Sequence, residues 1–127
     1  MSKELEDLLN LFKEKKYLIA EKKCLKLIKK IKPNHEIYNI YAVILFELNK
    51  YDEAIKYWKK AIELNSRYFF GYNNLANVYF KKNEFKKALE CYDKAIEIKP
   101  DYYEAYHNKG NVFVNLDDFT NAIKSFD

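Results

Sequence analysis

Four asparagines stand in two matching segments of the chain, Asn74-Leu75-Ala76-Asn77 and Asn108-Lys109-Gly110-Asn111, which are 34 residues apart. A side-chain amide both donates and accepts hydrogen bonds, so a row of asparagines can pair with the N–H and C=O groups of an extended peptide whatever its sequence. At 100° per residue, one side of the helix expected around the first segment carries Phe70, Asn74, Asn77 and Lys81. This spacing predicts a face that holds peptide backbone. The alternative is that asparagine is merely a tolerated polar residue on a hydrated surface.

Other chemistry has little support in the sequence. His35 and His107 are far apart along the chain, and neither Cys24 nor Cys91 has a nearby histidine that would make it a nucleophile. No glycine-rich phosphate loop and no metal-ligand spacing is present. The sequence therefore predicts no enzyme activity, no cofactor and no metal site, and it assigns His107 to the peptide-binding side.

The helix expected around residues 37–46 is apolar on nearly every side. A helix of this kind needs cover all round. Ile40 and Val43 occupy the places that asparagines hold in the later segments, so they could form an apolar pocket, with Phe70 as a third wall. The alternative is that the helices before them cover these side chains.

The elements that position these residues follow from a strict repeat. Ala20, Ala54, Ala88 and Ala122 are 34 residues apart, and an aromatic residue stands three positions before each. Within residues 69–102, apolar residues recur at helical spacing in two runs that a polar corner, residues 82–84, separates. Pro100 then ends the second run. The repeat unit is therefore a pair of helices, and the fold class is all-α.

This pattern resembles the tetratricopeptide repeat (TPR) family, on the following residues of the best-matching unit: Tyr72, Leu75, Ala76, Tyr79, Ala88, Tyr92, Ala95 and Pro100. The resemblance implies a right-handed superhelix of antiparallel helix pairs whose first helices line a concave groove that holds other proteins. We expect a single solenoid over residues 1–127 with about three and a half repeats. Its units are 1–34, which is degenerate, 35–68, 69–102 and 103–127, which is incomplete.

The asparagine segments also resemble the asparagine ladder of the repeats in O-linked N-acetylglucosamine transferase and related bacterial arrays. That resemblance implies that Asn74 and Asn108 hold peptide backbone, with Asn77 and Asn111 in the same groove.

A full fourth unit would extend past residue 127. The short second helix of this unit leaves Ala122, Ile123 and Phe126 without a following helix, and exposed apolar ends of repeat arrays associate. We therefore expect either a fragment of a longer array or a homo-oligomer formed through these residues.

The leading hypothesis is a protein-interaction scaffold with a protein or peptide partner. The alternatives are the substrate-recruiting N-terminal part of a longer enzyme, such as a glycosyltransferase, and an assembly module. The longest apolar run is too short to span a bilayer, and residues 1–10 do not resemble a signal peptide, so we expect a cytoplasmic protein without membrane partners. Residues 1–34 contain ten lysines and five acidic residues, yet no aromatics alternate with the lysines, and nucleic-acid binding is not expected.

Overall fold

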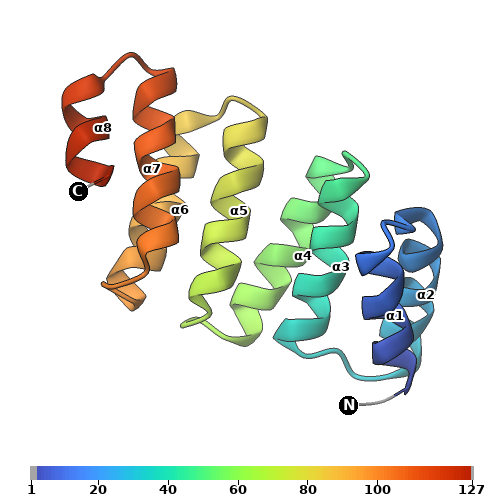
Figure 1. Cartoon of the computed structure of the whole chain (residues 1–127). Coiled ribbons are helices and arrows are strands. Elements are labelled where there is room, and N and C mark those ends of the chain that lie inside the picture. Colours follow the sequence, from blue (N-terminus) through green and yellow to red (C-terminus); the bar gives the residue numbers. More distant parts are fainter. Residues whose placement is uncertain (1–2, 127) are drawn as a thin grey trace. The chain divides into compact units, whose positions relative to one another are not determined.

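A computed structural model describes residues 3–126, and in that part of the chain all regular structure is helical (Figure 1). The chain divides into two compact units, Met1–Leu64 and Asn65–Asp127. The first unit contains α1 (Lys3–Lys13), α2 (Tyr17–Lys30), α3 (His35–Glu47) and α4 (Tyr51–Leu64). The second contains α5 (Phe69–Lys81), α6 (Phe85–Ile98), α7 (Tyr103–Asn115) and α8 (Phe119–Phe126). The all-α prediction is confirmed.

Each unit consists of two helix pairs that stack directly on one another. In the first unit α1 packs on α2 and α3 on α4, while α2 also packs on α3. In the second unit α5 packs on α6 and α7 on α8, and α6 packs on α7. The first helices α5 and α7 also touch each other, and Figure 1 shows them side by side with α6 behind them. Side chains on α5 and α7 can therefore face one common ligand.

A left-handed residue turns the chain at the corner of every pair. Lys15, Asn49, Asn83 and Asp117 have φ values of 59°, 61°, 61° and 57°. The N–H of the next residue donates to a carbonyl five positions back, for example from Glu84 to Tyr79 at 2.8 Å. This is the Schellman arrangement that ends a helix, and asparagine and aspartate tolerate its left-handed residue better than other non-glycine residues do. The polar corners predicted from the sequence are therefore helix caps.

The alanines of the repeat lie where the two helices of a pair come closest. Ala20, Ala54 and Ala88 are completely buried. Trp58 and Tyr92 occupy equivalent positions, six residues before the last residue of their helices, and fill the space beside these contacts. A second aromatic contact closes each of the first three corners, as between Phe80 and Phe85, whose ring centroids are 5.7 Å apart. In the fourth pair Val114 stands where the first ring belongs, and Phe119 remains exposed.

Candidate functional site

The asparagine face predicted from the sequence lies on α5 and α7 in the second unit. Asn77 is half-buried there, and its side-chain oxygen accepts a hydrogen bond from the Tyr92 hydroxyl. Tyr92 is almost completely buried, and burial raises the pKa of its hydroxyl, which therefore remains a donor. Asn77 thus has a structural bond through its oxygen, and its NH₂ group is left to donate.

Asn73 is the residue that orients this face, and the sequence analysis missed it. Its side chain is only 1% exposed, and its oxygen accepts a hydrogen bond from Asn108 Nδ2 at 3.3 Å. Asn73 also hydrogen-bonds to the hydroxyl of Tyr102, which donates to Glu104 Oε2 at 3.2 Å. Burial first, and the Glu104 carboxylate second, raise the pKa of the Tyr102 hydroxyl. This network fixes the Asn108 amide, because its NH₂ group is engaged and its oxygen is left to accept.

The other predicted groove residues of α5 and α7 are accessible. Asn74 and Asn111 are half-buried, and Lys81 is exposed. The Asn111 backbone oxygen accepts from Asn115 Nδ2 at 3.0 Å, and no described residue pairs with the Asn111 side-chain amide. The face therefore offers amide groups from both helices.

An aromatic cluster borders the asparagines at the start of α5. The Phe70 ring is 48% exposed and lies 5.7 Å from the ring of Tyr102 and 4.4 Å from that of Phe69. Since Tyr102 also belongs to the Asn73 network, the exposed ring and the amides are supported by the same residue.

Ile40 and Val43 do line a pocket, and it belongs to the first unit. The pocket has a volume of about 160 Å³, and its other walls are Leu9, Phe12 and Asn39. Asn39 is held there because its oxygen accepts from Trp58 Nε1 at 2.8 Å. The helix is partly covered and partly open: Ile37 and Ile44 are buried, whereas Ile40 and Val43 stay half-accessible. Phe70 lies in the other unit, so its role as a third wall remains a prediction.

His107 and the predicted association residues lie together at the contact of α7 with α8. The His107 ring lies 5.4 Å from the ring of Phe126, so it takes part in this contact, and its role in peptide binding stays a prediction. Ile123 is 62% exposed and Phe126 is also exposed. The prediction that Ala122 shares this exposed surface is wrong, because Ala122 is buried between the two helices like the equivalent alanines.

Among residues 3–126, no group of three or more His, Cys, Asp or Glu side chains could hold a metal ion. In the same part of the chain, every helix is too short or too polar to cross a membrane.

Several solved structures have a fold similar to that of this chain. MamA matches with a TM-score of 0.88 and 28% identity over 97% of this chain and 72% of its own. YrrB, a TPR protein with an unusual peptide-binding site, matches with a TM-score of 0.80 and 17% identity over 91% of this chain and 59% of its own. A tetratricopeptide repeat protein from Parabacteroides merdae matches with a TM-score of 0.84 and 20% identity, over 97% and 49% of the two chains.

No curated protein matches the sequence at a significant level. The TPR repeat family matches residues 43–83 and 76–117, which together make up more than half of the chain. The chain therefore belongs to the tetratricopeptide repeat family.

Proposed function

We propose that the chain is a non-catalytic scaffold that holds an extended segment of a partner protein on the α5–α7 face. The observation that carries this proposal is the set of amide groups left over by the internal network. The Asn77 NH₂, the Asn108 oxygen and the whole Asn111 amide are available for a ligand, and they lie on two helices that touch. Donors and acceptors in this mixture suit the alternating N–H and C=O groups of a peptide.

Two further observations support a peptide ligand. The half-exposed Phe70 ring offers an apolar contact for one side chain of the segment. YrrB has the same fold and a peptide-binding site, so an array of this architecture can present one.

Backbone recognition can be tested separately from side-chain recognition. A randomised peptide array first identifies a binding peptide, and the same peptide is then synthesised with N-methylated backbone amides. N-methylation removes backbone donors and leaves every side chain unchanged, so we expect it to abolish binding. Equal binding of the methylated peptide would refute the proposal.

The matching protein variant is Asn111→Ala. Loss of one hydrogen bond of about 1 kcal/mol should weaken peptide binding about fivefold in fluorescence anisotropy. Asn10→Ala is the control, because Asn10 is an exposed helical asparagine of the first unit. If the control weakens binding as much as Asn111→Ala, the α5–α7 face is not the site.

A second candidate function is self-association through α8. Phe119, Ile123 and Phe126 are exposed large hydrophobic residues on this one short helix. An apolar surface is complementary to itself, so two copies would meet in a twofold contact of α8 with α8. Light scattering tests this: Ile123→Asp should shift a dimer to monomer, and Lys124→Asp should not. A wild-type protein that is monomeric at all concentrations would exclude self-association.

A further inference from the structure

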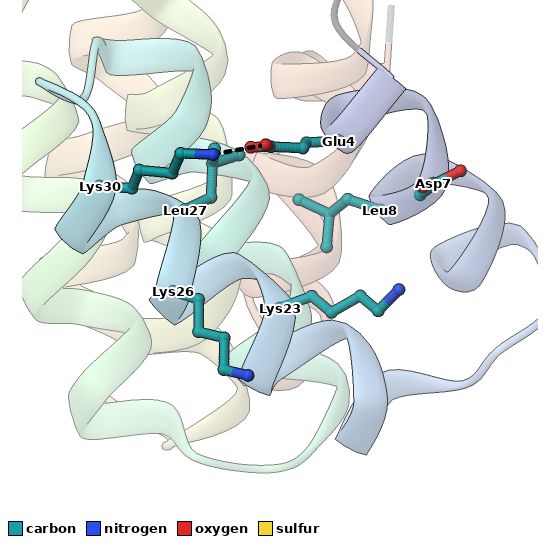
Figure 2. A pocket seen from close by; sticks show the side chains of 7 residues that line it. All are labelled: Glu4, Asp7, Leu8, Lys23, Lys26, Leu27 and Lys30. Atoms are coloured by element: carbon teal, nitrogen blue, oxygen red, sulfur yellow. Dashed lines mark hydrogen bonds and ion pairs between the residues drawn. The ribbon is translucent and has the colours of Figure 1, made fainter.

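The first repeat contains a hollow at a place that aromatic side chains occupy in the second repeat. It lies between α1 and α2, has a volume of about 330 Å³, and is lined by Glu4, Asp7, Leu8, Lys23, Lys26, Leu27 and Lys30 (Figure 2). In the second repeat, Tyr38, Tyr41 and Tyr57 occupy the positions of Glu4, Asp7 and Lys23. The Tyr57 ring lies 4.7 Å from the Tyr41 ring and 5.8 Å from the Tyr38 ring, so three aromatic side chains fill this place. The hollow exists because charged side chains replace the rings.

The floor of the hollow is apolar and its rim is basic. Leu8 and Leu27 are buried, and Figure 2 shows Leu8 directed from α1 toward Leu27 on α2. Lys30 is neutralised by Glu4, whose Oε1 lies 2.8 Å from the ammonium nitrogen. Lys23 and Lys26 are exposed and have no acidic partner in the described chain.

The carboxylate of Asp7 points away from Lys23 and Lys26 in Figure 2. These two cations are therefore left for a ligand.

The edge of α1 next to the hollow does not suit a further apolar helix. Tyr41 of α3 is buried and interacts with Glu21 and Cys24 of α2, and the buried Ile37 lines one pocket with Leu27 and Lys30 of α2. The equivalent residues of α1 are Asp7 and Lys3. Stacking apolar surface on this edge would bury charges without partners, which is strongly unfavourable. The apolar α8 face of a second copy is excluded as the occupant for the same reason.

We propose that this hollow, distinct from the α5–α7 face, is a docking site for an acidic peptide segment that carries an aromatic side chain. The aromatic ring enters between the two helices and rests on Leu8 and Leu27, where the second repeat has its own rings. Carboxylates on either side of that ring pair with Lys23 and Lys26. A polyanion without an aromatic group fits the site less well, because Glu4 and Asp7 are close and one of the three lysines is already paired.

The probe is a short peptide with one central tyrosine flanked by glutamates, and its binding is measured by fluorescence anisotropy with the full chain. Replacement of the tyrosine by alanine should weaken binding at least tenfold, because burial of the ring is lost. Binding of the parent peptide should also weaken as salt is added.

Three protein variants test the location. Lys23→Glu with Lys26→Glu should weaken binding about tenfold or more, since it replaces two attractive pairs by two repulsive ones. Lys22→Glu with Lys29→Glu changes the net charge equally on the same helix, outside the hollow, and should change the affinity less than threefold. Lys23→Tyr restores the ring found in the second repeat, so it should abolish peptide binding while raising the melting temperature.

Each outcome decides the proposal. Equal binding by the alanine peptide, equal effects of the two charge reversals, or retained binding by Lys23→Tyr would overturn it. Displacement of the peptide by a single-stranded oligonucleotide or by anionic lipid vesicles at similar concentrations would also overturn it, because the surface would then be a general polyanion site. Circular dichroism of each variant establishes that the loss of binding is not a loss of fold.

Discussion

Replacement of Asn73 by alanine tests whether the buried amide network supports the α5–α7 face. The change removes the acceptor for Asn108 Nδ2 and the hydrogen bond to the Tyr102 hydroxyl. The Tyr102 hydroxyl keeps its hydrogen bond to Glu104, so this former partner of Asn73 still has one hydrogen bond. Two lost hydrogen bonds at a site that is 1% exposed should cost about 2 kcal/mol of unfolding free energy. For a chain of this size that corresponds to a decrease of about 8 °C in the melting temperature.

The assay is urea unfolding followed by far-ultraviolet circular dichroism, which reports the helices of both units. Asn108→Ala and the double variant complete a thermodynamic cycle. Because the two side chains bond to each other, their coupling free energy should be about 1 kcal/mol. A loss below about 0.5 kcal/mol for Asn73→Ala, or additive effects of the two substitutions, would refute the role assigned to this residue.

Asn73→Asp sharpens the test because it keeps the size and the acceptor but introduces a carboxyl group. Burial and the nearby Glu104 carboxylate should raise the pKa of the new side chain above its ordinary value. A group whose folded pKa is raised stabilises the fold fully below its unfolded pKa, and that contribution is lost as pH rises through the folded pKa. The variant should therefore be close to wild type at acidic pH and less stable than Asn73→Ala at neutral pH. A pH-independent difference from wild type would contradict this reasoning.

Three other predictions concern stability. Lys15 has a φ of 59°, so Lys15→Gly should stabilise the protein by about 0.5 to 1 kcal/mol in urea unfolding, whereas Lys16→Gly, at a φ of −89°, should give no gain. Burial raises the pKa of the Cys24 thiol to about 12 from an ordinary 9.0, so the stability contributed by the neutral thiol is complete well below pH 9 and decreases above it. By pH 10 about 1.4 kcal/mol of unfolding free energy should be lost, and Cys24→Ala should lack this decline between pH 8 and 10. A side chain at Gly110 would overlap the Phe126 ring, so Gly110→Ala should lower the melting temperature of the wild-type protein. In a Phe126→Ala background the overlap is gone, and the same substitution should stabilise the protein by about 1 kcal/mol, the usual gain of Gly→Ala within a helix.

Periodicity was sufficient to predict the helix pairs and their corners. The polar corner at residues 82–84 separates α5 from α6, and α6 ends at Ile98, ahead of Pro100. These features can be predicted locally, because the apolar spacing of a helix and the backbone restriction imposed by proline both depend on residues that are close together in the sequence. The left-handed geometry of Asn83 follows from the same local rules, since the asparagine side chain suits that conformation.

The predicted site was less complete because a helical wheel describes only one helix. It identifies the face of α5 that packs on its own partner α6, and it assigns the remaining residues to solvent. Asn73 lies on neither face, since its environment is made by Asn108 of the following repeat and by Tyr102, the residue directly before α7. The signal that could have revealed it is the polar tip of Tyr102, because a buried tyrosine hydroxyl needs a hydrogen-bond partner.

The second helix of the pair likewise determines which part of the Asn77 amide is left for a ligand, because the Tyr92 hydroxyl occupies the Asn77 oxygen. The buried aromatic position of the second helix is Trp58 in the second repeat and Tyr92 in the third, and each donates to an asparagine of the first helix. In the fourth repeat Phe126 has no polar group, and its ring lies against His107 instead. The aromatic residue of each pair therefore decides whether an asparagine is bound to the core. Tyr92→Phe should release the Asn77 oxygen, which would cost about 1 kcal/mol of stability and add an acceptor to the α5–α7 face.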